Sequence, residues 1–132
     1  MAFLYNGTVL GVVLAVLRSG GKFGLPNACF FLNKKAAQAY TNANPKQNVK
    51  DVSKRYSIDL KELLPLAKPI VLEFDAAKIR INYKGIEIMT GQPEFEAAGP
   101  AHLCTLTEKS KKEIIKKLGI VKGDELYKVL YF

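Results

Sequence analysis

The spacing of apolar residues changes near Pro69, and this change limits the fold more than any other feature of the sequence. Residues 49–68 place apolar side chains at helical intervals, whereas residues 70–90 alternate apolar and polar side chains, as a half-buried strand does. A chain of 132 residues suits one domain. We therefore expect an α+β fold: a small single domain over residues 1–132, with several mostly antiparallel strands and three or four short helices.

The alternating region predicts three strands, at residues 70–75, 78–83 and 86–90. The Lys-Gly pair at 84–85 is expected to form a tight turn between the second strand and the third. The segment that follows, residues 91–102, has no clear periodicity, so we expect it to be a loop.

The most apolar run of the chain lies at residues 8–17. Asn6-Gly7, just before it, is a common hairpin signal, because both positions of the turn need positive φ. The valines of the run favour a strand, and because apolar and polar side chains do not alternate along it, we expect the strand to be buried on both faces. A buried helix is the alternative. The run is about half as long as a membrane-spanning helix, so we expect no membrane partner. Residues 28–32 predict a second buried strand.

Three short helices are expected between these strands and the alternating region. Each has a polar residue suited to cap its N-terminus, namely Asn33, Asn48 and Asp59. The second helix, residues 49–57, turns Val49, Val52 and Tyr56 inward. The second and third helices together have the outline of a helix-turn-helix. We favour a plain helical corner, because no glycine or recognition helix supports the sharper interpretation.

A last helix is expected to begin after Thr107, a good N-cap, and to end at Gly119, where a left-handed residue is favoured. Its inward side is formed by Ile114, Ile115 and Leu118. A Gly-Asp turn and a terminal strand over residues 125–132 are expected to follow.

Basic residues outnumber acidic ones, 20 to 12, for a formal net charge of +8. They gather in residues 33–56 and 105–132, with an acidic stretch between. Excess positive charge favours an anionic partner. Most of the bases are lysine, a point charge, which favours contact with a phosphate backbone over the reading of bases. The candidate nucleic-acid-binding residues are Lys34, Lys35, Lys46, Lys50, Lys54, Arg55, Lys109, Lys112, Lys116 and Lys117.

Two of these assignments have alternatives. The lysines of the last helix are also explained by solvation and by the helix dipole, which favours positive charge near the C-terminus. Tyr40, Tyr56 and Tyr83 would stack on bases if they were exposed, but their spacing favours the core.

The C-terminal segment "KEIIKKLGIVKGDELYKV" resembles the helix-glycine-turn-strand segment of the AbrB-like swapped-hairpin transcription factors. The matching residues are Lys112, Glu113, Ile114, Lys117, Leu118, Gly119, Ile120, Gly123, Asp124 and Glu125. The resemblance implies an intertwined dimer that binds DNA. It is confined to residues 112–129, and because no arginine of the family has a counterpart here, no DNA-contacting residue is carried over.

No recognisable catalytic or metal-binding motif occurs in the sequence. His102 is the only imidazole, and the two cysteines, Cys29 and Cys104, lie far apart, so we expect two buried thiols without a disulfide. We expect no cofactor, no metal and no enzymatic activity. The sequence predicts a small, basic, intracellular, cytoplasmic protein that binds DNA or RNA mainly through backbone contacts. The alternative is a protein-interaction or structural module, of the kind that phages and viruses use as accessory proteins, with an acidic protein as partner. The sequence also leaves open the formation of a homo-oligomer.

Overall fold

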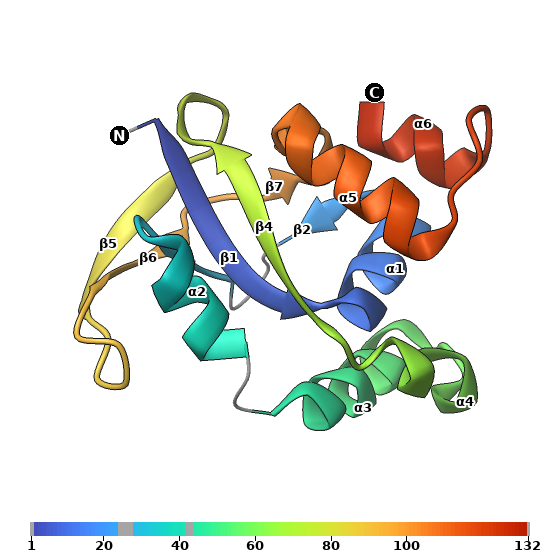
Figure 1. Ribbon diagram of the computed structural model, residues 1–132, viewed down its shortest axis with the longest axis horizontal. Coiled ribbons are helices and arrows are strands. Elements are labelled where there is room, and N and C mark those ends of the chain that lie inside the picture. The colour runs from blue at the N-terminus through green and yellow to red at the C-terminus, as the bar shows by residue number, and fades with distance from the viewer. Residues whose placement is uncertain (1, 24–27, 42–43, 132) are drawn as a thin grey trace.

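A computed structural model describes residues 2–23, 28–41 and 44–131, except for the side chains of Tyr40 and Thr41. It confirms an α+β fold whose described strand pairs are all antiparallel. The main sheet has five strands in the order β4-β1-β3-β6-β5 (Figure 1). Its strands are β1 (Phe3–Val9), β3 (Cys29–Phe31), β4 (Pro69–Asp75), β5 (Ile81–Ile86) and β6 (Pro93–Ala97). A separate two-stranded sheet pairs β2 (Lys22–Phe23) with β7 (Ala101–His102).

The described residues form six α-helices, more than the three or four expected from the sequence. They are α1 (Leu10–Arg18), α2 (Lys34–Thr41), α3 (Pro45–Tyr56), α4 (Leu60–Leu63), α5 (Glu108–Leu118) and α6 (Glu125–Tyr131). Three short 3-10 helices lie at Leu64–Leu66, Ala76–Lys78 and Leu103–Thr105. None of the helices in the described part of the chain is both long and apolar enough to cross a membrane.

The expected hairpin at Asn6-Gly7 is wrong, because both residues lie inside β1. There they pair with Leu72 and Val71 of β4, and this pairing keeps the backbone extended. The apolar run that follows is helix α1, the alternative that the sequence left open. Burial on nearly all sides explains why a valine-rich segment is helical here, since tertiary packing overrides a modest β preference.

Alternation along the central strands sends side chains to two different layers. On β4, Ile70, Leu72 and Phe74 enter the main core, whereas Val71 packs with the layer that contains α2. Helix α2 is capped as expected, because the N–H of Lys35 donates to the Asn33 side-chain oxygen at 2.7 Å. Helix α2 therefore covers one face of the sheet, and the main core lies on the other.

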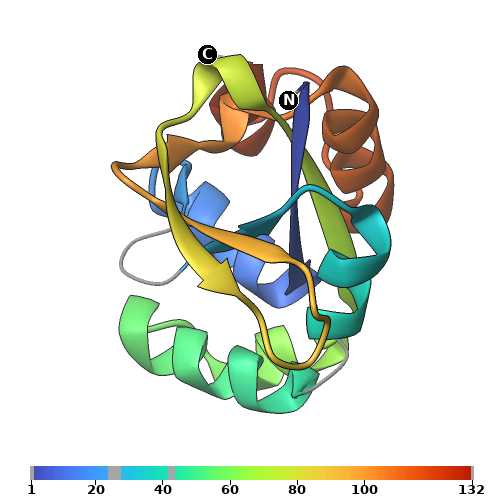
Figure 2. The same cartoon turned by 90° about the vertical axis from the view of Figure 1, so that its left-hand side faces the viewer.

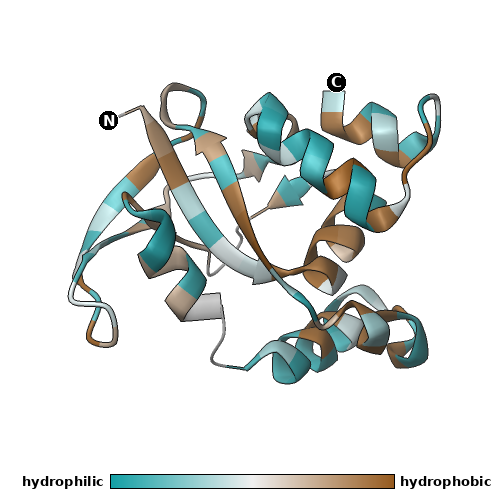
Figure 3. Cartoon of the chain, viewed as in Figure 1, coloured by the Kyte–Doolittle hydropathy of each residue, from teal (hydrophilic) through white to brown (hydrophobic). Residues whose placement is uncertain are grey.

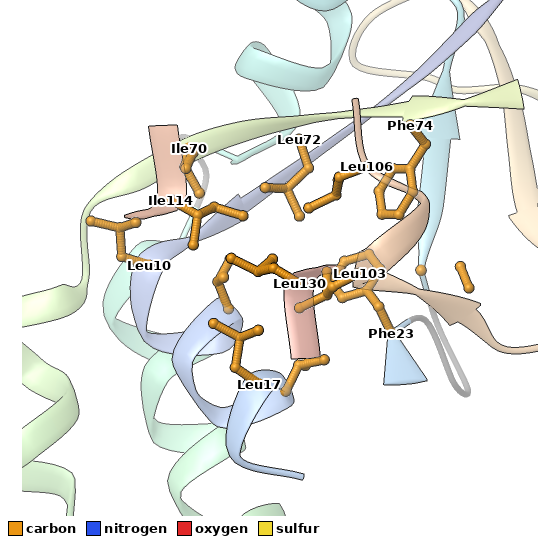
Figure 4. Packing of buried hydrophobic residues seen from close by; sticks show 14 of the residues in the cluster. Leu10, Leu17, Phe23, Ile70, Leu72, Phe74, Leu103, Leu106, Ile114 and Leu130 are labelled. Carbon is orange, nitrogen blue, oxygen red and sulfur yellow. The ribbon is translucent and has the colours of Figure 1, made fainter. Parts of the chain in front are cut away.

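The main core joins the sheet to helices α1, α5 and α6. Figure 4 shows Leu10 and Leu17 of α1, Ile114 of α5 and Leu130 of α6 directed toward one another beneath the strand residues. Phe74 meets Phe30 edge-on, with 5.4 Å between the ring centroids. Such a core accounts for most of the stabilisation expected of a small domain, because its side chains are removed from water.

Helices α3 and α4 pack on the outer side of α1, with Val9, Leu14, Val49 and Leu63 as their buried contacts. The inward positions predicted for this region are correct: Val49 is fully buried, and Val52 and Tyr56 are half-buried. The predicted cap at Asn48 is wrong, because α3 begins at Pro45. Proline is accepted in the first turn since its missing N–H would have no helical partner there. The predicted cap at Asp59 is correct: its side chain accepts from the N–H of Lys61 at 3.0 Å.

The second half of the sheet differs from expectation at four places. The predicted strand 78–83 starts later, at Ile81, and the predicted turn at 84–85 is an irregularity within β5, where Gly85 has a φ of 125°. The predicted strand 86–90 is a turn beyond its first residue, and the predicted loop 91–102 contains β6 and β7. The turn carries exposed apolar side chains, of which Ile88 is 97% exposed. Figure 2 shows the chain turning back between β5 and β6 at one end of the sheet.

The C-terminal region contains one confirmed prediction and one error. Helix α5 begins after Thr107, whose side chain accepts from the N–H of Ser110, and it ends at Gly119, which has a φ of 65°. The strand predicted for residues 125–132 is instead helix α6, which ends at Tyr131. The strand that the AbrB-like resemblance implies after the Gly-Asp turn is therefore absent from the described residues.

Candidate functional site

Helix α3 presents a straight row of three exposed lysines, Lys46, Lys50 and Lys54, hereafter the α3 lysine row. Their spacing of four residues places them along one side of the helix. None of the three forms an ion pair with a described residue. The row is therefore a line of uncompensated positive charge.

The remaining candidates of the first basic stretch lie on α2 and α3. Lys34 and Lys35 are exposed in the first turn of α2, where Asn33 caps the helix. Arg55 is exposed next to Lys54 on α3. The acidic residue nearest to them in sequence, Asp51, accepts a hydrogen bond from the Gln47 side chain at 2.9 Å.

The candidates of the second basic stretch lie on α5. Lys109, Lys112 and Lys116, hereafter the α5 lysine row, are exposed, and none of them pairs with an acid among the described residues. Lys117 is different, because its Nζ lies 4.0 Å from Glu113 Oε1. Lys111 stands 4.7 Å from the centre of the Tyr131 ring and helps to dock α6 on α5.

The two lysine rows lie on different helices, and a third helix separates them. Helix α1 lies between α3 and α5 and contacts both (Figure 1). Figure 3 shows α1 as mainly hydrophobic, whereas α3 and α5 carry hydrophilic bands. The sequence-predicted residues therefore lie on three helices, α2, α3 and α5.

A cavity of about 360 Å³ opens beside α3. It is lined by residues of β1, α1, β2, β3 and α3. Helix α3 contributes Asn48, Asp51, Val52, Arg55 and Tyr56. Cavities that bind small molecules range from about 300 to 1,000 Å³ and combine apolar walls with a few polar groups, and this cavity has both properties.

The most unusual residue of this cavity is Asn6, which is only 4% exposed. Its Nδ2 donates to the main-chain carbonyl of Cys29 at 2.7 Å, which orients the amide. Its Oδ1 has no hydrogen-bond donor among the described residues. A buried polar atom without a partner costs about 1–3 kcal/mol, so such atoms are uncommon away from functional sites.

Sequence reasoning missed Asn6, which was assigned to a turn. The available signal was its position inside an apolar run, with Leu4 and Thr8 at the inward positions on either side. An asparagine at an inward strand position has to meet a polar partner or a cavity. The three tyrosines that were expected in the core differ from one another. Tyr56 lines the cavity, Tyr83 is 62% exposed rather than buried, and the Tyr40 side chain lies outside the described residues.

Arg18, at the end of α1, is paired with Glu62 of α4. The Arg18 guanidinium donates a hydrogen bond to the Glu62 carboxylate. This hydrogen bond lowers the pKa of Glu62 and raises that of Arg18. The pair joins α1 to α4, and its charges compensate each other.

A second cavity, of about 270 Å³, contains His102, Cys104 and Glu125. No set of three metal-ligand side chains comes together there or elsewhere in the part of the chain that the structure describes. Cys29 is buried and Cys104 is half-buried, and no disulfide joins them. The absence of a disulfide matches the sequence-based expectation, whereas full burial of Cys104 does not.

Comparison of the chain with protein-family models, with curated proteins and with solved structures finds no match.

Proposed function

We propose that this chain is a small, non-enzymatic, cytoplasmic protein that binds nucleic acid through the surface formed by α2 and α3. The observation that carries the proposal is the α3 lysine row, because its three charges are exposed, regularly spaced and unpaired with any acid in the described residues. Lysines release the counterions condensed on a phosphate backbone when they replace them, and this release drives sequence-independent binding.

The α2–α3 surface is a better candidate than the α5 surface for two reasons. Lys117 of α5 is already near Glu113, and Lys111 is engaged with the Tyr131 ring. The α3 surface also adjoins a cavity, to which Arg55 contributes. Proteins that hold single strands combine positive charge along the backbone with aromatic side chains on which bases stack, and Tyr56 lines the cavity together with Arg55.

The test uses fluorescence anisotropy with a labelled mixed-sequence single strand, DNA or RNA, over a range of salt concentrations. If about five phosphates are engaged, the slope of log K against log salt should be roughly −3.5 to −4.5. Lys46, Lys50 and Lys54 are then replaced together by Gln. This triple variant should bind at least about tenfold more weakly at low salt, and the magnitude of its slope should fall by roughly 2 to 3.

The matched control is the triple replacement of Lys109, Lys112 and Lys116 by Gln. It removes the same charge from another exposed helix surface, so it should have the smaller effect if α3 is the interface. An equal loss in both triple variants would show that net charge alone attracts the strand. An absence of binding at low salt would overturn the proposal in favour of the alternative, an acidic protein partner.

A further inference from the structure

We propose that the outer edge of β5 pairs with the same edge of a second copy of this chain, so that two five-stranded sheets join into one continuous sheet. The inference goes beyond the proposed function and does not depend on it. Three features of β5 support it: an open sheet edge, exposed apolar side chains beside that edge, and a sequence that is complementary to itself in an antiparallel pair.

The two edge strands of the main sheet differ in how their outward main-chain groups are used. On β4, the N–H of Glu73 donates to Ser110 Oγ at 2.8 Å, and the Glu73 carbonyl accepts from the N–H of Thr107 at 2.9 Å. Phe74 of β4 also forms a bridge with Leu106. Strand β5 pairs with β6 alone among the described strands, and in Figure 1 none of the described elements lies beyond it. An uncovered edge of this kind is a template for another strand.

The hydrogen bonds between β5 and its neighbour show which main-chain groups face outward in the first half of the strand. The N–H of Ala98 donates to the carbonyl of Arg80 at 2.8 Å, so the main-chain groups of Arg80 face β6. Bonded and unbonded pairs alternate along an antiparallel ladder. The N–H and carbonyl of Ile81 and of Tyr83 therefore point away from β6, toward the open edge.

The second half of the strand offers a matching group. The register shifts between Tyr83 and Gly85, and beyond this irregularity the N–H of Glu87 donates to the carbonyl of Gln92 at 3.0 Å. By the same alternation, the N–H and carbonyl of Ile86 point outward. No hydrogen bond joins these outward groups to another described segment.

Exposed apolar side chains gather beside the same edge. Tyr83, Ile86, Ile88 and Met89 are 62%, 59%, 97% and 62% exposed, and they are half of the large exposed hydrophobic residues in the described part of the chain. The turn that carries two of them is firmly built, because the Glu87 carboxylate accepts from the N–H of Met89 at 2.7 Å and from that of Thr90 at 2.8 Å. Apolar side chains grouped in this way on a surface mark an interaction site.

The side chains of Ile81 and Ile86 lie on one face of the sheet. On β6 they are opposite Ala97 and Pro93, which are separated by an even number of residues and therefore share a face. Two strands can thus run antiparallel with Ile81 of one copy opposite Ile86 of the other, and the two isoleucines then meet as a cross-strand pair. Their outward N–H and carbonyl groups face each other in this register and exchange two hydrogen bonds.

The same register matches charges, and this match identifies the occupant as a second copy. The residue before Ile81 is Arg80, and the residue after Ile86 is Glu87, so opposite charges lie across from each other. A two-fold axis repeats both pairs, which makes the interface isologous and closes the assembly at a dimer. A strand of another protein would have to supply the apolar match and the charge match independently.

The centre of the proposed interface lies at the irregularity in β5, where Lys84 of each copy is next to the two-fold axis. The Lys84 Nζ is 3.6 Å from Glu94 Oε1 within its own chain. This ion pair reduces the repulsion between the two lysines, so the centre of the interface does not oppose the pairing on either side.

The experiment measures the molar mass of the intact protein by sedimentation equilibrium over a roughly hundredfold range of concentration. A reducing buffer prevents disulfide links through Cys104. We expect the mass to rise from monomer to dimer and no further. Hydrogen exchange, followed by NMR at both ends of the range, then locates the interface. The N–H groups of Ile81 and Ile86 should exchange at least roughly tenfold more slowly in the dimer, whereas that of Asn82, which faces β6, should be protected at both concentrations.

Two pairs of variants test the register and the apolar contact. Arg80→Glu places two carboxylates opposite each other and should raise the Kd of the dimer at least roughly tenfold, while Lys109→Glu makes the same change of charge on α5 and should leave it unchanged. Ile86→Lys should also dissociate the dimer, because a lysine on an edge strand blocks pairing. Its control is Val121→Lys, at a similarly exposed apolar position outside the sheet. Circular dichroism checks that each variant folds.

A protein that stays monomeric at every concentration would overturn the inference. A dimer in which the Ile81 and Ile86 amides stay unprotected, or which Arg80→Glu leaves intact, would place the interface elsewhere and overturn it as well. A mass that grows beyond the dimer would contradict the two-fold pairing. These outcomes are distinct from those of the salt titration with the lysine variants, which tests the proposed function.

Discussion

The side-chain oxygen of Ser110 accepts a hydrogen bond from the main-chain N–H of Glu73 at 2.8 Å. The same strand residue is also bonded twice to Thr107, once by its carbonyl and once by its carboxylate, each at 2.9 Å. The first turn of α5 is thereby attached to β4 at a single residue. These contacts hold the first turn of the helix against the edge strand β4.

Replacing Ser110 with Ala should reduce the free energy of unfolding by about 1–3 kcal/mol, because the part-buried N–H of Glu73 would lose the acceptor that the buried Ser110 supplies. Urea denaturation measures the change. The control is Lys109→Ala, at the exposed neighbouring position, which should change stability by no more than about 0.5 kcal/mol. A Ser110→Ala protein as stable as the parent would mean that water or a shifted backbone replaces the hydroxyl.

Truncating a side chain on the core-facing side of α5 should lower the free energy of unfolding by an amount that depends on how deeply that side chain is buried. Ile114 is fully buried, so Ile114→Ala should cost about 2–5 kcal/mol. Ile115 is half-buried, so Ile115→Ala should cost clearly less. Both variants lose the same atoms from adjacent positions of one helix, and each therefore serves as the control for the other. Equal losses of stability in the two variants would contradict the placement of the Ile114 side chain in the core.

Stability should fall in alkaline solution partly because of Tyr131. Its hydroxyl donates to Glu108 Oε1 at 2.7 Å, and this bond, followed by burial and by the Glu108 charge, raises the pKa of Tyr131 to about 12. An unfolded tyrosine titrates near 10. Between these values the folded state binds more protons than the unfolded state, so the contribution is complete below about pH 10 and is lost as the pH rises toward about 12.

The measurement compares the urea midpoints of the parent and of Tyr131→Phe across that range. The parent should be the more stable protein at about pH 9, and the difference should disappear toward about pH 12. Other tyrosines and lysines titrate there too, but they are common to both proteins and cancel in the difference. Tyr83→Phe, on the edge strand β5, removes the hydroxyl of an exposed ring and controls for the loss of a hydroxyl as such.

The two thiols should react at different rates with an alkylating reagent. Cys29 is 6% exposed within β3, whereas Cys104 is half-buried beside the second cavity. Mass spectrometry of the native protein after brief alkylation should find the label mainly on Cys104. Labelling in urea, where both thiols are accessible, is the control. Faster labelling of Cys29 would contradict the packing of β3 against α2.

The parts of the fold that the sequence predicts well are those determined by neighbouring residues. Helix α5 has a cap at Thr107, a glycine stop at Gly119 and an inward stripe, all within its own segment. Strand β4 is similarly visible because one face is buried along its length and the burial alternates. Local signals of this kind survive folding because tertiary contacts reinforce them.

The errors occur where distant segments decide the local structure. Asn6-Gly7 has the chemistry of a turn, but pairing with β4 holds it extended. Residues 125–131 have strand-forming side chains, but Leu130 and Tyr131 are used to pack a helix against the core and α5. The cavity was invisible for the same reason, because Asn6, Val16 and Tyr56 lie far apart in the sequence and meet only after the sheet and α3 are assembled.

The pairing of β1 with β4 also bears on how the chain reaches its native state. Sixty residues separate Val9 from its partner Pro69, and β1 meets β3 at only one described register position, Tyr5 with Phe31. Closing so large a loop costs chain entropy before any ladder is gained, which slows folding. Meanwhile α1 keeps its apolar surface uncovered until α5 and α6 arrive. The order in which segments leave the ribosome is therefore unfavourable, and the interval before β4 and α6 emerge is the period in which this protein is most exposed to misassembly.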